Sequence, residues 1–148
     1  MFIAVTDVPE IKGEYKRASV RQVCLMMVSD RLIPLDSANE AVIEEKLCRE
    51  RRSFLKPLIY DSDLAEYHPN FCLTDTPSGD IYPMEVWGLD QVGYLLHRQE
   101  KTVWYNTHYP QSWWGWDAAG DPQRKKITDF PCRAASYAEK YPWPVEEN

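Results

Sequence analysis

The sequence predicts an α/β fold in which a mixed central sheet is flanked by helices. Three observations support this prediction. A helical pattern over residues 37–52 precedes three short β-like segments, a second helical pattern lies at 90–106, and a last β-like segment lies at 113–116. The predicted order of the core is therefore α-β-β-β-α-β, which combines antiparallel strands with one strand that follows a helix.

Length and composition agree with one soluble domain. The chain has 148 residues, of which 44% are hydrophobic and 27% charged, and this composition excludes a disordered chain. The longest apolar runs, Phe2–Val5 and Cys24–Val28, are far shorter than the roughly 20 residues that a bilayer requires. No signal-peptide pattern begins the chain, so we expect a cytoplasmic protein without membrane contact. The cysteines have no zinc-site spacing and are expected to be buried free thiols: Cys24, Cys48, Cys72 and Cys132.

The regions outside the predicted core are an N-terminal extension over 1–35 and a tail over 118–148. In the extension, residues 17–28 carry apolar side chains at helical spacing, so a helix is expected there. The tail is rich in proline, charged and aromatic residues, and we expect it to wrap the surface of a single domain spanning 1–148. The core itself is expected to span 37–117.

The first half of the core begins with a capping box. Ser37 and Glu40 stand three residues apart before an apolar pattern, which is typical of a helix N-terminus. The helix is expected to run to about Arg52, with Ala41, Ile43 or Glu44, and Leu47 facing inward. The next segment, Phe54–Tyr60, contains Pro57 and is therefore expected at a sheet edge.

A β-hairpin is predicted next. The segments Phe71–Thr76 and Ile81–Trp87 flank the turn sequence Pro77–Asp80. A regular register about this turn pairs Asn70 with Glu85, with Cβ atoms about 5 Å apart on one face.

The second helix is expected from Leu89 or Asp90 to Asn106. Tyr94, Arg98, Lys101 and Tyr105 fall on one of its faces. After it, Trp113–Trp116 is expected to form a short strand. The tryptophans here, together with Trp104, fit either core packing or a platform on which unpaired bases stack; we favour core packing.

Glu85 is the most unusual residue of the predicted sheet. It lies within the otherwise apolar strand Ile81–Trp87, where a buried carboxylate is costly unless it is paired or bound to a metal. One interpretation is a salt bridge to Arg98 or Lys101 on the following helix. The other is a metal ligand.

These residues carry a resemblance to a known superfamily. Pro69–Phe71, a hairpin, Glu85–Gly88, and then Tyr94, Arg98 and Lys101 on a helix resemble the core of the PD-(D/E)xK nucleases, which have a restriction-endonuclease-like fold. More narrowly, residues 50–131 resemble the C-terminal region of an uncharacterised bacterial family that is common on plasmids and integrative elements. Four blocks carry this likeness: Lys56–Tyr60, Phe71–Thr76, Met84–Gly88 and Trp113–Asp117.

The resemblance implies phosphodiester hydrolysis assisted by Mg²⁺ or Mn²⁺. Glu85 matches the second acid of the motif, and Glu44 or Glu45 matches an extra carboxylate that some members use. Two departures stand out. The first acid is replaced by Asn70, a weaker metal ligand, and the lysine position holds Trp87, so that Lys101 or Arg98 is the expected catalytic cation.

The charge pattern bears on nucleic acid. A net charge of −6 disfavours a protein that coats DNA or RNA passively. Basic residues nevertheless cluster at Lys46–Lys56 and at Arg124–Lys126, as solvated faces or as a phosphate-binding patch. The predicted nucleic-acid contacts are Arg49, Arg51, Arg52 and Lys56.

Three functions remain open at this point. The first is a metal-dependent nuclease of a mobile element. The second is a catalytically degenerate, nuclease-derived scaffold that binds DNA or a protein partner. The third is a small interaction protein whose acidic surface engages a basic partner. The oligomeric state is open in all three.

Overall fold

The computed structural model describes residues 1–58 and 67–136, which belong to two compact units. The first unit is Met1–Ala38 and the second is Asn39–Asn148. Their boundary lies next to the predicted boundary between the N-terminal extension and the core. No helix in the described ranges has the length and apolar character needed to cross a membrane.

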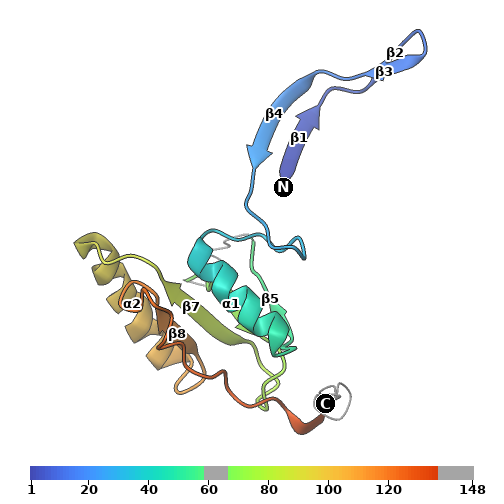
Figure 1. Ribbon diagram of the computed structural model, residues 1–148. Helices are drawn as coiled ribbons and strands as arrows, with labels where there is room; N and C mark the ends of the chain where they lie inside the picture. Colours follow the sequence, from blue (N-terminus) through green and yellow to red (C-terminus); the bar gives the residue numbers. More distant parts are fainter. Residues whose placement is uncertain (59–66, 137–148) are drawn as a thin grey trace. The chain divides into compact units, whose positions relative to one another are not determined.

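The first unit is a two-stranded β-ribbon that continues into a short hairpin (Figure 1). Strand β1 (Phe2–Thr6) pairs antiparallel with β4 (Val20–Leu25), and β2 (Glu10–Lys12) pairs antiparallel with β3 (Tyr15–Arg17). Gly13, with a φ of +67°, opens the two-residue turn between β2 and β3. A positive φ at this position favours glycine.

The helix predicted over 17–28 is therefore wrong, and the N-terminal extension is a ribbon. Val20 and Val23 are β-branched, and their side chains suit a pleated strand as well as a helix face. The deciding contribution comes from β1, whose backbone groups pair with those of residues 20–25. Apolar spacing alone could not reveal this pairing between distant segments.

The second unit has the predicted order α-β-β-β-α-β. Its four-stranded sheet has the strand order β5-β6-β7-β8; the first two pairings are antiparallel and the third, across the α2 crossover, is parallel. The mixed α/β class is thereby confirmed. The elements are α1 (Ala38–Arg49), β5 (Phe54–Leu55), β6 (Phe71–Leu73), β7 (Tyr82–Trp87), α2 (Val92–His108) and β8 (Trp114–Asp117).

The predicted hairpin register is confirmed. Phe71 pairs with Met84, and Leu73 pairs with Tyr82, so that the same register places Asn70 opposite Glu85. The edge strand β5 is shorter than the predicted segment 54–60, whose last two residues lie outside the described ranges.

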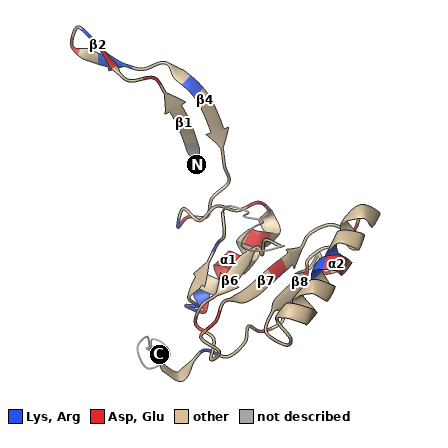
Figure 2. Ribbon diagram, turned by 180° about the vertical axis from the view of Figure 1, so that it is seen from behind, with Lys and Arg blue, Asp and Glu red and all other residues tan. Residues whose placement is uncertain are grey.

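The two helices lie on opposite faces of this sheet (Figures 1 and 2). Side chains alternate along β7: Met84 and Val86 point to the face that α1 covers, while Glu85 points toward α2, where it pairs with Lys101. The face under α1 is apolar. Its buried side chains include Ile43, Leu47, Phe71, Leu73, Met84, Val86, Trp114 and Trp116, which confirms core packing for the last two tryptophans.

Helix α1 ends in a Schellman motif. The backbone N–H of Arg52 donates to the carbonyl of Leu47, and that of Arg51 donates to the carbonyl of Cys48. Arg51 consequently adopts a φ of +53°, in the left-handed region where glycine is usual. The described part of the tail packs on this unit, with the Phe130 ring 5.3 Å from the Trp114 ring; residues 137–148 lie outside the described ranges.

The cysteine prediction is correct in part. Cys72 is buried, whereas Cys24 and Cys132 are exposed, and all four thiols are free. Cys24 is exposed on strand β4 of the first unit, and Cys132 is exposed in the tail of the second.

Candidate functional site

A buried polar cluster lies between β7 and α2, on the face of the sheet that α2 covers. Figure 2 shows an acidic segment on the β7 ribbon and a basic segment on α2. The Glu85 carboxylate, only 2% exposed, receives the Lys101 ammonium at 2.6 Å and the Tyr105 hydroxyl at 2.7 Å. Lys101 also donates to the backbone carbonyl of His68 at 3.1 Å. The predicted salt bridge from Glu85 to the following helix is thus present, with Lys101 as its partner.

Helical periodicity explains how α2 supplies both partners. Lys101 and Tyr105 are four residues apart and belong to the face that helical spacing predicts to carry them together with Tyr94 and Arg98; both are buried. Tyr94, one end of the same face, packs its ring 6.5 Å from that of Trp87. The sequence therefore identified this face correctly.

The electrostatics of the cluster are dominated by burial. Burial raises the pKa of Glu85, while Lys101 and Tyr105 oppose the rise by stabilising the carboxylate. The pKa of Tyr105 is raised by burial and by the nearby carboxylate. The same two causes raise the pKa of the Cys72 thiol to about 11, so that this cysteine is a protonated core residue.

Arg98, the other predicted catalytic cation, has a different partner. Its guanidinium pairs with Asp117 at the end of β8, at 3.0 Å, and lies over the Trp87 ring. Of the two candidate cations, the structure therefore brings Lys101 to Glu85.

The other predicted metal ligands, Asn70 and Glu44, contact groups of α1. The Asn70 side chain accepts a hydrogen bond from the Val86 backbone at 2.8 Å and donates to Glu40 at 2.7 Å. Glu44 accepts a hydrogen bond from the Cys48 thiol at 3.2 Å. Asn70 and Glu85 lie opposite each other in the hairpin, as predicted. The Asn70 amide nevertheless binds Glu40 of α1 and not the Glu85 carboxylate.

The residues present do not fit Mg²⁺ or Mn²⁺. These ions prefer several oxygen ligands, yet Glu85 has an ammonium against its carboxylate and the amide oxygen of Asn70 is engaged by a backbone N–H. Across residues 1–58 and 67–136, no group of three or more His, Cys, Asp or Glu side chains could hold a metal ion.

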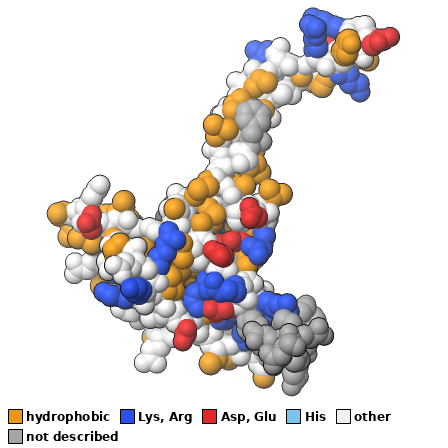
Figure 3. Space-filling model, viewed as in Figure 1, with side chains coloured by type: hydrophobic (Ala, Val, Ile, Leu, Met, Phe, Trp, Pro, Cys, Tyr) orange, Lys and Arg blue, Asp and Glu red, His pale blue; other side chains and the backbone are white. Residues whose placement is uncertain are grey.

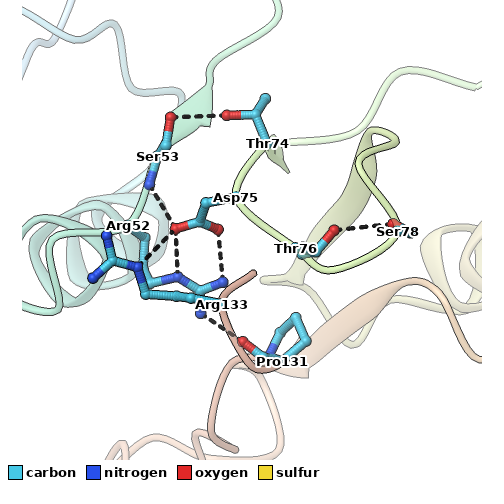
Figure 4. A network of polar contacts seen from close by, with 8 residues as sticks. All are labelled: Arg52, Ser53, Thr74, Asp75, Thr76, Ser78, Pro131 and Arg133. Atoms are coloured by element: carbon cyan, nitrogen blue, oxygen red, sulfur yellow. Dashed lines mark hydrogen bonds and ion pairs between the residues drawn. The ribbon is translucent and has the colours of Figure 1, made fainter. Parts of the chain in front are cut away.

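A second buried cluster joins the end of α1 to the loop after β6 (Figure 4). Asp75, fully buried, receives the Arg52 guanidinium through two hydrogen bonds of 2.7 and 2.9 Å and the Ser53 backbone at 3.0 Å. Arg133 from the tail lies 3.5 Å from the same carboxylate. Sequence reasoning missed this cluster, because no spacing rule connects residues 52, 75 and 133.

Two of the predicted nucleic-acid contacts consequently have structural roles. Arg52 is buried in the Asp75 cluster, where it also donates to the carbonyl of Pro131. The Lys56 side chain is 6% exposed and pairs with Glu40 at 3.0 Å. The prediction that Arg52 and Lys56 contact nucleic acid is therefore wrong, because both side chains are engaged in packing α1 and its C-terminal end against the sheet. Arg49 and Arg51 remain exposed.

The ion pairs of the second unit divide its cations into two groups. Within its described residues, Lys46, Arg52, Lys56, Arg98, Lys101 and Arg133 each lie beside a carboxylate. The exposed cations for which this part of the chain shows no ion pair are Arg49, Arg51, Arg124, Lys125 and Lys126. They fall in the two segments that the sequence singled out. Basic side chains are visible on the face that carries α1 (Figure 3).

Trp104 lies outside the core. It stacks on His108 with ring centroids 4.3 Å apart and lines an open groove of about 510 Å³ with Tyr67 and Leu96. The groove is mostly apolar and lies along the outer face of α2.

The second unit defines a small mixed α/β domain whose polar cluster is buried beneath one helix. The family described as "Protein of unknown function (DUF1173)" matches residues 11–119. The chain belongs to this family, and the match includes parts of both units. No curated protein and no solved structure matches the chain.

Proposed function

We propose that this protein binds nucleic acid through a nuclease-like scaffold that has no hydrolytic site. The observation that carries the proposal is that the Glu85 carboxylate is already bound by neighbouring side chains. Its buried carboxylate is held by Lys101 and Tyr105, so that the one acid matching the nuclease motif serves the packing of α2. The α-β-β-β-α-β order supports the restriction-endonuclease-like part of the proposal.

Support for nucleic acid as the ligand comes from the exposed cations. In a chain of net charge −6, affinity for phosphates must come from a local patch. Arg49 and Arg51 lie at the C-terminal end of α1 and remain exposed. Such contacts would neutralise backbone phosphates without reading base sequence.

A nuclease is the second candidate, because Lys101 and Glu85 lie side by side as the resemblance implies. In that case Glu85 and Asn70 would have to release their present partners before Mg²⁺ or Mn²⁺ could bind, and Lys101 would be the cation beside the acid because Arg98 pairs with Asp117. The engaged side chains of Asn70 and Glu85 favour the binding function.

Binding and cleavage can be measured together on the full chain. We expect labelled duplex DNA to bind in EDTA, with an affinity that falls steeply with salt, and to remain intact when Mn²⁺ is added. The double variant Glu85→Gln and Lys101→Met, which leaves no uncompensated buried charge, should leave affinity unchanged. Mn²⁺-dependent cleavage that this double variant abolishes while it remains folded in urea unfolding would establish the nuclease instead. Absence of binding to duplex and single-stranded DNA at low salt would contradict both and favour a protein partner.

Arg51→Gly separates binding from folding. Glycine suits the left-handed backbone of residue 51, so we expect the free energy of unfolding to stay the same or rise by up to about 1 kcal/mol. The lost cation should reduce the slope of log affinity against log salt by about 0.9. Urea unfolding and a salt titration of DNA binding measure the two effects.

Gln111→Gly is the matched control, since Gln111 is exposed and also has a positive φ of 59°. It should change stability in the same direction while the salt slope stays constant. An unchanged slope for Arg51→Gly would remove residue 51 from the binding surface.

A further inference from the structure

The segment after β8 is a loop whose backbone is fixed from within by one carboxylate. Asp121 is 4% exposed. Its carboxylate accepts hydrogen bonds from the backbone N–H groups of Lys125 at 2.9 Å and Lys126 at 2.7 Å, and from the Trp116 indole at 3.1 Å. The Trp116 ring lies in the core, so these bonds anchor the loop to the sheet.

The same loop holds three consecutive cations outward. Arg124, Lys125 and Lys126 are exposed, while their backbone is turned inward onto Asp121. The Arg124 backbone N–H donates to the Asp121 carbonyl at 2.9 Å, and Arg124 adopts a φ of +57°. A non-glycine residue persists in this strained conformation only where the surrounding structure imposes it.

A fixed backbone lowers the entropic cost of binding. Long cationic side chains lose conformational freedom when they contact a ligand, but this loop does not have to be ordered at the same time. The three positive charges are adjacent and exposed, and the charge of Lys126 also lowers the pKa of Asp117 and of Asp121. Within the described residues, Arg124 and Lys125 have no ion pair to a carboxylate. The natural ligand of the three cations is therefore a row of anionic groups such as the phosphates of a DNA backbone.

We infer that the loop formed by residues 121–126 is a phosphate-binding element for duplex DNA, with Asp121 as the positioning residue and Arg124, Lys125 and Lys126 as the contacts. This inference rests on the proposed nucleic-acid-binding function and assigns part of that function to a second segment. The contacts are to the sugar-phosphate backbone, so they contribute affinity without base specificity.

The first test is the triple variant Arg124→Gln, Lys125→Gln and Lys126→Gln. The salt slope of duplex DNA binding should fall by about 2–3, with the midpoint of thermal unfolding unchanged. The control removes three exposed cations from the ribbon by Lys12→Gln, Lys16→Gln and Arg17→Gln. If both triple variants lowered the salt slope equally, net charge alone would explain the effect, and the inference would be overturned.

The second test is Asp121→Ala, which makes the net charge of the protein less negative. General electrostatics predicts tighter DNA binding for this variant. Loss of the positioning carboxylate predicts weaker binding, by severalfold, together with faster proteolysis near residue 124. Tighter binding with an intact fold would contradict the role of Asp121. If Asp121→Ala unfolds, Arg124→Gly replaces it in the test. Glycine relieves the strained backbone at this position, so this variant should bind DNA more weakly without loss of stability.

The two proposals fail differently. The wild-type chain could bind DNA with an affinity that the 124–126 triple variant does not change and the double variant Arg49→Gln and Arg51→Gln abolishes. That result would overturn only the role of the loop in binding. No DNA binding by the wild-type chain would overturn the proposed function and the loop with it.

Discussion

Asp75→Asn is expected to lower the free energy of unfolding by about 3–5 kcal/mol at pH 7. The substitution keeps the shape of the side chain but removes the charge that compensates the buried Arg52 and the neighbouring Arg133. Breaking a buried pair by removing one partner leaves the remaining charge uncompensated, which explains the size of the effect. Urea unfolding of the full chain measures it.

The pH dependence of the same variant identifies the cause. Burial would raise the pKa of Asp75, but the Arg52 and Ser53 hydrogen bonds outweigh it and the net pKa lies below the usual range. Asp75 therefore contributes stability that is present above the unfolded pKa of about 4 and is lost as the pH falls through the lower folded value. The difference between wild type and Asp75→Asn should shrink over this acid range. A constant difference would contradict the ion-pair explanation.

Asp80→Asn provides the control, because Asp80 is exposed in the turn of the same hairpin. Its effect on the free energy of unfolding should stay within about 0.5 kcal/mol.

Lys101→Met should also destabilise the protein by about 3–5 kcal/mol at pH 7. It removes the ammonium that compensates Glu85 and leaves a carboxylate buried between β7 and α2 with the Tyr105 hydroxyl. Adding Glu85→Gln to this variant should restore most of the lost stability, because the double variant contains no uncompensated charge. Thermal or urea unfolding of the single and double variants measures this coupling.

Acid should partly rescue the single variant. In the wild type, burial already raises the pKa of Glu85, while Lys101 opposes the rise. Removing the Lys101 ammonium therefore raises the pKa of Glu85 further. A raised carboxyl pKa means that stability is highest below the unfolded pKa and is lost as the pH increases through the folded value. The deficit relative to wild type should therefore be smaller at pH 5 than at pH 8.

Arg98→Met is the matched control on the same helix. Its partner Asp117 is about half exposed, and exposed pairs contribute about 0–1 kcal/mol. A loss for Arg98→Met as large as that for Lys101→Met would show that helix packing, and not the buried charge, determines the result.

The fold of the second unit could be predicted in detail because its signals are local. The predicted capping sequence begins at Ser37, directly before α1, and the turn at Pro77–Asp80 sets the hairpin register. On α2, Lys101 and Tyr105 lie on one face and are buried. In the ribbon, the local pattern of residues 17–28 favoured a helix, and only pairing with β1 decided otherwise.

The candidate site shows the same division. The composition of the strand around Glu85 indicated a carboxylate that is either paired or bound to a metal, and helical spacing placed Arg98 and Lys101 within reach; the structure shows Lys101 as the partner. Nothing in the spacing of residues indicated that Asn70 would turn to Glu40, or that Arg52 would leave the predicted basic patch for Asp75. Each of these contacts joins segments whose relative position is fixed only when the sheet and α1 have packed.

The sequence by itself determined the elements of the core, their order, the hairpin register and the two basic segments. These properties depend on backbone preferences and periodicity within a few neighbouring residues. The tertiary structure alone decided which of the charged residues remain available to a ligand. Burial makes an uncompensated charge costly, so the packed unit pairs Lys101, Arg52 and Lys56 internally and leaves Arg49, Arg51 and the 124–126 segment exposed.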